Sequence, residues 1–153
     1  MPECKLDYLF SFSFALKLPP EVIGELPEGI RANFYLDGGP VEGPRLKGKV
    51  LAVGADYLVI RKDGVGVLDV RATFESEDGA LIYAPYRGTI DAGPDGYHRF
   101  LNNDLPTKMP VRNAPRFQTA HADYAWLNRL QCFGVGECDL EANRVSYDVY
   151  AAP

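Results

Sequence analysis

An acidic and a basic side chain, Asp69 and Arg71, lie two residues apart in the stretch VLDVRATFESEDGALIYAPYRG, residues 67–88. Side chains two apart in a β-strand project from the same face of the sheet. A nearby guanidinium keeps a carboxylate ionised, and it offers a fixed fork of donors to a carboxylate or enolate oxygen. Inside a pocket this pair can support acid–base and electrostatic chemistry, whereas on a wet surface it contributes little.

The turn that follows decides which residues share a face with this pair. If the turn around residues 78–79 holds two or four residues, the odd-numbered residues of the first strand share a face with the even-numbered residues of the second. Asp69 and Arg71 then share a face with Ala84 and Tyr86. A three-residue turn with a bulge inverts this parity, so that odd-numbered residues share a face with odd-numbered ones. We favour the first arrangement, because a face with charges, a phenol and small apolar groups is typical of a ligand pocket. The alternative is the solvated face of an antiparallel sheet.

These patterns predict a site on the hairpin. Arg71 is expected to act as an electrostatic clamp, and Asp69 either holds Arg71 or acts as a base. Tyr86 or Tyr124 is expected to donate a proton. The residues predicted to contact the ligand are Asp56, Thr73, Tyr83, Trp126 and Asn128, of which Trp126 is read more simply as a plug in the core.

Strict alternation of apolar and polar residues predicts that the chain consists almost entirely of strands. Many strands with turn punctuation and little helix indicate a sandwich or a barrel, and sequential pairing favours antiparallel neighbours. We predict an all-β fold, a single closed antiparallel barrel of about eight strands with one short helix, forming one domain over residues 1–153. The predicted strands are 5–17, 30–37, 46–53, 56–62, the two strands of the 67–88 hairpin, 116–120, 130–138 and 143–151; the short helix is HADYAWLNRL, and residues 91–115 form a long loop.

Composition and charge argue against several classes of binding partner. The formal net charge is −5, without the basic footprint expected of a nucleic-acid-binding domain, and an anionic membrane surface would repel the chain. The 3 cysteines form no CxxC pair, and no dinucleotide, phosphate-binding or metalloprotease motif occurs. We therefore expect no cofactor, no metal, no nucleic acid and no membrane partner. The N-terminus lacks the pattern of a signal peptide, which favours a cytoplasmic location.

Several segments together resemble a known family. GPRLKGKVL, GADYLVIRKDG, LDVRATFESEDGALIYAPYRG, RFQTAHADYAWLNR and VSYDVYA look like the bacterial and fungal family called domain of unknown function 3237, over most of the chain from about Leu6 to Ala151. The resemblance implies a small antiparallel barrel grouped with allene oxide cyclase-like barrels. That wider group includes cofactor-free cyclases and proteins that guide small-molecule coupling.

We therefore expect a barrel whose lumen binds a small, largely apolar organic molecule with an oxygen function. The leading hypothesis is a cofactor-free isomerase, cyclase or lyase, because such steps need an oriented acid–base group and stabilisation of an enolate. A non-catalytic carrier or sensor with the same pocket is the alternative, and a solidly packed structural barrel is a third reading. Strand 5–17 is apolar on one face and partly apolar on the other, which favours a homodimer.

Overall fold

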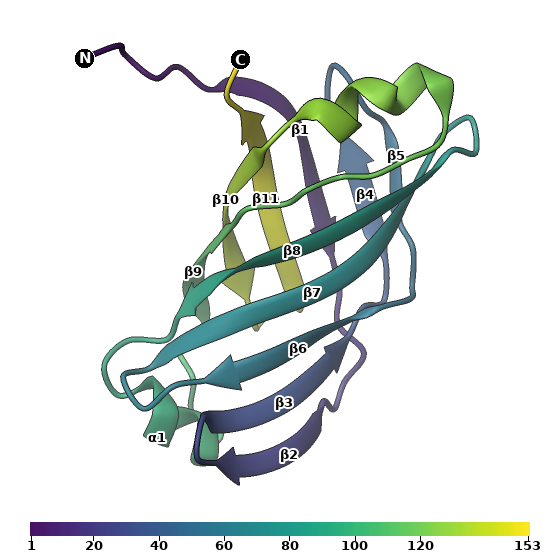
Figure 1. Ribbon diagram of the computed structural model, residues 1–153. Coiled ribbons are helices and arrows are strands. Elements are labelled where there is room, and N and C mark those ends of the chain that lie inside the picture. The colour runs from purple at the N-terminus through teal and green to yellow at the C-terminus, as the bar shows by residue number, and fades with distance from the viewer.

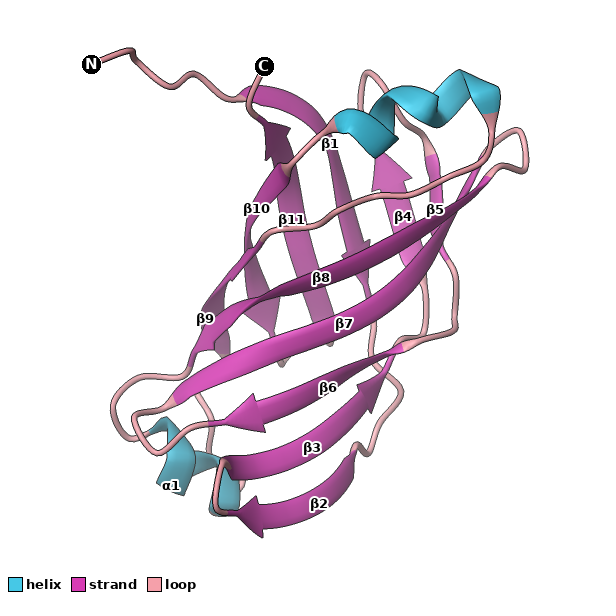
Figure 2. Cartoon of the chain, viewed as in Figure 1, coloured by secondary structure: helices cyan, strands magenta, loops and turns pink.

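The computed structural model describes residues 1–153 as strands, short connections and two short helices (Figures 1 and 2). Neither helix has the length and apolar character needed to cross a membrane. The first six strands are β1 (Asp7–Phe14), β2 (Glu21–Leu26), β3 (Gly29–Tyr35), β4 (Gly39–Glu42), β5 (Gly48–Val50) and β6 (Ala55–Ile60). They are followed by β7 (Val65–Ser76), β8 (Leu81–Asp91), the helix α1 (Gly96–Leu101), β9 (Lys108–Asn113), the 3₁₀ helix η1 (Ala122–Arg129), β10 (Cys132–Asp139) and β11 (Arg144–Ala151).

Eight strands close into an antiparallel barrel, in the order β7, β5, β4, β1, β11, β10, β9, β8 and back to β7. Closure pairs the long strands β7 and β8 along their whole length, as Figure 1 shows. Each strand of the ring therefore has a hydrogen-bonded neighbour on both sides, which removes exposed edges. The closed barrel predicted from the alternation is confirmed.

The remaining strands widen one half of the barrel. β6 pairs with the first half of β7, and β3 and β2 continue outward from β6. β5 and β6 pair with successive parts of the same edge of β7. The chain bends between them at Gly54, where φ is +90°. A Cβ at this position would lie 2.0 Å from the carbonyl oxygen of Arg71, so only glycine fits there. In Figure 2, β6, β3 and β2 continue the sheet beyond β7, and α1 lies beside the ends of β2 and β3.

The half of the barrel under η1 is filled by aromatic rings. Phe74 packs against Phe10, Phe12 and Phe117 with ring centroids 4.9–6.3 Å apart. Leu127 of η1 is fully buried and belongs to the same hydrophobic core. We call this half the η1 end and the opposite half the α1 end. Because the η1 end is packed with side chains, we expect room for a ligand at the α1 end.

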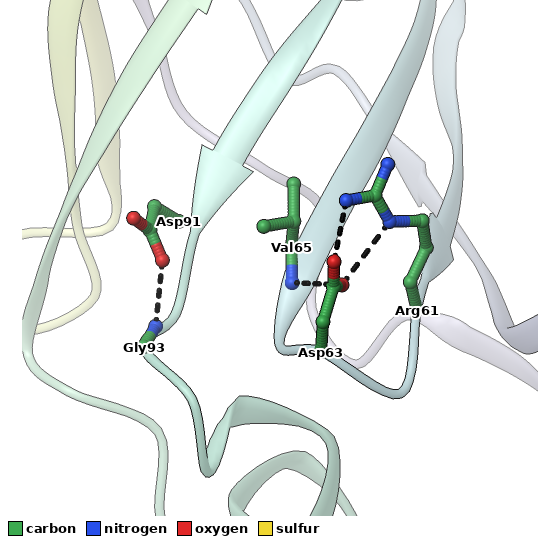
Figure 3. A network of polar contacts seen from close by, with 5 residues as sticks. All are labelled: Arg61, Asp63, Val65, Asp91 and Gly93. Atoms are coloured by element: carbon green, nitrogen blue, oxygen red, sulfur yellow. Dashed lines mark hydrogen bonds and ion pairs between the residues drawn. The ribbon is translucent and has the colours of Figure 1, made fainter.

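Two tight turns hold the α1 end together (Figure 3). Asp63 accepts hydrogen bonds from Nε and a terminal nitrogen of Arg61 at 3.1 and 2.6 Å, and from the Val65 amide at 3.2 Å. Asp91 accepts from the Gly93 amide at 2.9 Å. Between these turns, the Gly64 carbonyl accepts from the Ala92 amide at 3.1 Å, so the β6–β7 turn supports the chain that leads into α1.

Gly64→Ala should destabilise the protein far more than Gly79→Ala. Both glycines have φ near +90°, but a Cβ at Gly64 would lie 1.7 Å from the carbonyl oxygen of Gly93, whereas Gly79 has nothing within 4 Å. We expect a loss of about 3 kcal/mol at Gly64, from backbone strain and overpacking together, and about 1 kcal/mol at Gly79. Urea unfolding measures both, and equal losses would show that the two turns do not pack as described.

Three sequence-based assignments are corrected. The predicted strand 116–120 contributes only an isolated bridge between Tyr83 and Gln118. The predicted loop 91–115 contains α1 and β9. In β9, Pro110 and the charged residues on either side hide the alternation of apolar and polar residues that marks a strand. The strand β2 was missed because its residues remain exposed on both faces, which gives no period-two pattern.

Candidate functional site

The hairpin parity expected from the sequence is wrong. Arg71 lies opposite Pro85, and Thr73 lies opposite Tyr83, so the odd-numbered positions of β7 and β8 share a face. The cause is a three-residue turn, residues 77–79, that ends in the left-handed Gly79 and is closed by hydrogen bonds between Ser76 and Ala80. The inverted parity puts the even-numbered residues, including Tyr86, inside the barrel.

Asp69 and Arg71 consequently lie on the outer face of the barrel. Asp69 forms an ion pair with Arg87 of β8, with 3.8 Å between the guanidinium nitrogen and the carboxylate oxygen, and does not pair with Arg71. Arg71 is exposed, and its guanidinium carbon lies 6.0 Å from the centroid of the Tyr57 ring. The expected Asp69–Arg71 clamp inside the lumen is therefore corrected to two separate surface contacts.

Three predicted ligand contacts border an open hollow on the outside of the barrel. Thr73, Tyr83 and Asn128 line it together with neighbours from residues 118–120. The Asn128 side chain donates to the Thr119 carbonyl and accepts from the Thr119 amide, both at 2.8 Å. Asn128 thus fastens η1 to the strand-like segment beside β8, on the outside of the wall.

Tyr124 and Trp126 lie at the η1 end, away from the lumen. The Tyr124 hydroxyl donates to Asp78 at 2.8 Å, and the Trp126 ring lies 3.8 Å beneath the guanidinium carbon of Arg45. Donor atoms of Asp78, His121 and Asp123 come within 4.8 Å of one another here, but Asp78 and His121 already accept hydrogen bonds that cap η1 and close the turn. We therefore interpret these three residues as part of the cap of η1 and not as a metal site.

The α1 end of the barrel contains a cavity, lined by residues of β1, β3, β6–β11 and α1 and of the connections beside them. Its volume is about 80 Å³, counted as the space that the centre of a water molecule can occupy. Of 20 lining residues, 18 are apolar or aromatic, and the other two are Asp56 and Gly66. Two predicted site residues, Asp56 and Tyr86, meet in this cavity; Tyr147 and Cys138 join them.

Asp56 is placed in the cavity by the inward face of β6, which it shares with Leu58. The β6–β7 ladder lacks pairing at Tyr57 and Leu58. In this gap the Asp69 amide donates to Oδ1 of Asp56 at 3.0 Å, and the Arg31 guanidinium donates to the Tyr57 carbonyl at 3.5 Å. The carboxylate of Asp56 therefore replaces a backbone acceptor in the wall and is fixed in direction by that bond.

Burial among apolar side chains raises the pKa of the Asp56 carboxyl from 3.8 to about 7. The hydrogen bond from the Asp69 amide favours the ionised form and limits the rise, while the negative charge of Asp69 adds to it. No lysine, arginine or histidine lines the cavity to offset the desolvation. A carboxyl with a pKa near 7 can both take up and release a proton at neutral pH, as general acid–base catalysis requires.

Two buried phenols share the cavity with Asp56. The rings of Tyr86 and Tyr147 are 5.5 Å apart in an edge-to-face arrangement. Burial raises the pKa of both hydroxyls, and the negative charge of Asp56 raises the pKa of each further, so both stay protonated and able to donate. Burial likewise raises the pKa of the Cys138 thiol to about 11, which keeps it neutral. The polar groups of the cavity are thus one carboxyl and three neutral donors.

Five apolar cavity-lining residues that retain exposure mark its mouth: Leu16, Phe34, Phe100, Leu105 and Leu140. They belong to the ends of β1 and β3, to the α1 segment and to the β10–β11 turn. Two further lining residues, Asp56 and Ile90, are also partly exposed. An apolar mouth leading to a single acidic group suits a molecule that is largely apolar.

The sequence matches a family model described as a protein of unknown function (DUF3237), over residues 4–152. The chain belongs to this family. A related UPF0311 protein of Rhodopseudomonas palustris is 37% identical over 130 residues, which cover 83% of each chain. The family membership therefore supports the resemblance stated above.

Solved structures share the fold of this DUF3237 barrel. A beta-barrel like protein from Acinetobacter baumannii is 28% identical with a TM-score of 0.83, covering 100% of this chain and 98% of the other. An enzyme from Penicillium herquei is 22% identical with a TM-score of 0.70, at the same coverage. The second likeness concerns the fold alone.

Sequence reasoning missed Tyr147 and Cys138, and it gave Asp56 only a minor part. The signal for Asp56 was present, because it is the single charged residue among the alternating positions Asp56, Leu58 and Ile60, which face the core. Tyr147 likewise alternates with Val145 and Val149 on the inward face of β11. In this chain, the polar residues at inward-facing strand positions, Asp56 and Tyr147, indicated the cavity, whereas the charged pair Asp69 and Arg71 did not.

Proposed function

We propose that the barrel binds a small, largely apolar, uncharged organic molecule in the α1-end cavity and catalyses a cofactor-free proton transfer on it. The observation that carries the proposal is Asp56, the one charged side chain among the 20 that line the cavity, with a pKa near 7 beside two phenols. Perturbed carboxyls in apolar cavities are characteristic of acid–base sites.

The proposed step is an isomerisation of a carbonyl compound. The Asp56 carboxylate removes a proton from the carbon beside the carbonyl, and the C–H electrons form a carbon–carbon double bond as the oxygen becomes an enolate. Tyr86 or Tyr147 donates a hydrogen bond to that oxygen, which stabilises the developing charge in a dry cavity. In a β,γ-unsaturated carbonyl compound this enolate is conjugated with the second double bond. Asp56 can then return the proton to the γ-carbon, so the double bond moves and no other reactant is consumed. If the enolate carbon instead attacks a second carbonyl of the same molecule, a ring closes, and the proton held by Asp56 passes to the new alkoxide.

The polar group of the ligand is expected to be neutral. A carboxylate or phosphate would enter a cavity that has no cation on its wall and that already holds the acid Asp56. Burying a second anion there would be very costly without a partner. A neutral carbonyl, in contrast, can accept from the phenols and from protonated Asp56.

Tetralone, an enolisable bicyclic ketone, is a suitable probe. We expect saturable binding to the wild-type protein in calorimetric titrations, together with exchange of its α-protons for deuterium in D₂O faster than in buffer alone. Binding without faster exchange would favour the alternative, a carrier or sensor. The absence of binding by tetralone and by other neutral ketones of this size would contradict the ligand site.

Two further expectations from the sequence remain predictions. A homodimer is favoured by apolar side chains exposed on the outer face of β1 and β10, among them Tyr8, Phe133 and Val135. The cytoplasmic location also stays a prediction.

A further inference from the structure

One buried side chain of the barrel interior has no hydrogen-bond partner. Asn113, the last residue of β9, is 6% exposed, and both its Oδ1 and its Nδ2 are buried without a partner. They are the only buried side-chain polar atoms of the chain in this condition. Buried amides are nearly always hydrogen-bonded, so an unpartnered one calls for an explanation.

The strands on both sides of Asn113 carry glycine at the paired positions. Asn113 lies opposite Gly88 of β8 and Gly134 of β10. A Cβ at Gly134 would lie 1.9 Å from Oδ1 of Asn113 and 3.1 Å from Cδ1 of Tyr147, so the amide lies against Gly134, close to the Tyr147 ring. Any larger residue at position 134 would displace the amide.

Asn113 is also the next inward position after a residue of the cavity wall. Val111, two residues earlier on the same face of β9, lines the cavity, as does Tyr147. Gly134 leaves room for the Asn113 side chain because it has no Cβ, whereas a Cβ at Gly88 would meet the β9 backbone. A ligand contact would require the amide to turn from Gly134 toward Val111 and Tyr147, which line the cavity.

We propose that Asn113 is a second polar contact for the ligand and that it recognises a hydroxyl group. An amide offers both a donor and an acceptor, and a hydroxyl does the same, so one hydroxyl can satisfy both polar atoms. The ligand then carries two oxygen functions, one at Asp56 and a hydroxyl at the inner end. This inference rests on the proposed function, because it extends the same cavity.

Hydroxylated probes test the inference. We expect one or more monohydroxy derivatives of tetralone to bind wild-type protein about tenfold more tightly than tetralone itself. Asn113→Leu, which is similar in size and apolar, should bind tetralone as wild type does but lose the preference for the hydroxyl. It should also melt no lower than wild type, since it removes an unpartnered buried amide. Asn113→Ala removes the amide without adding bulk and should show the same loss of preference.

The outcomes separate the two proposals. Failure of tetralone and all its hydroxy derivatives to bind wild-type protein would overturn the ligand site, and with it this inference. Binding without any hydroxyl preference, or a preference that survives in both Asn113 variants, would overturn the role of Asn113 alone. A melting temperature well below that of wild type in both variants would show that the amide stabilises the resting barrel, which also contradicts the inference.

Discussion

Asparagine in place of Asp56 should lower the rate of proton exchange on bound tetralone by about a thousandfold, the scale of a lost general acid–base group. The substitution keeps the shape of the side chain, and its oxygen can still accept the hydrogen bond from the Asp69 amide. It removes the ability to take up and return a proton, together with the negative charge. We therefore expect tetralone affinity within a few-fold of wild type, measured by calorimetry beside the exchange rate.

Two outer-face variants serve as controls. Asp148→Asn makes the same chemical change at an exposed carboxylate of β11 that accepts from Ser11, and it should leave exchange unchanged. Arg71→Ala tests the clamp expected from the sequence; since Arg71 is exposed on the outer face, exchange should stay within about twofold of wild type. An Asp56→Asn protein that exchanges as fast as wild type, or an Arg71→Ala protein that loses exchange, would move the site out of the cavity.

The barrel could be predicted from the sequence because its signal is local. Alternation in residues 5–17 and 143–151 directly reports strands with one buried face, and these became β1 and β11. The hairpin register could not be read in the same way. It depends on whether Gly79 closes a two- or a three-residue turn, and a change of one residue moves every side chain of the strand to the other face.

The site depended on longer-range features. The alternation of Asp56 with Leu58 and Ile60 is a local signal for its inward position. Its role as an acid–base candidate also depends on the gap in the β6–β7 ladder and on burial by residues from many strands, and no local pattern encodes these two features. Arg71 drew attention because a charged pair is conspicuous in sequence. The segment 91–115, read as a loop, in fact supplies wall residues such as Phe100 and Val111 from α1 and β9.

The stability of the wild-type protein should fall relative to Asp56→Asn as the pH rises from about 4 to about 7. The pKa of Asp56 is 3.8 in its ordinary state and about 7 in the folded protein. Between these values the folded protein binds a proton that the unfolded chain has released, so raising the pH favours unfolding. Below both values the carboxyl is protonated in both states and adds nothing to the difference.

Above about pH 7 the carboxyl is ionised in both states, and the folded protein bears the full cost of the buried charge, on the order of 4 kcal/mol for a rise of this size. Asparagine has no such cost. The free energy of unfolding of Asp56→Asn should therefore exceed that of wild type by an amount that grows across this range and then levels off. Urea unfolding of both proteins at several pH values measures the difference, in which titration of all other groups cancels.

The pH dependence of this stability difference also tests whether Asp56 can act as a base. A difference that stays constant across this pH range would show that Asp56 keeps an ordinary pKa in the folded barrel. The carboxyl would then be too weak a base to take a proton from carbon, even if the cavity binds tetralone. A difference that grows as described would show that the protein bears a cost in stability for a carboxyl held near neutrality. Such a cost is expected where a buried charge is retained for its chemistry rather than for packing.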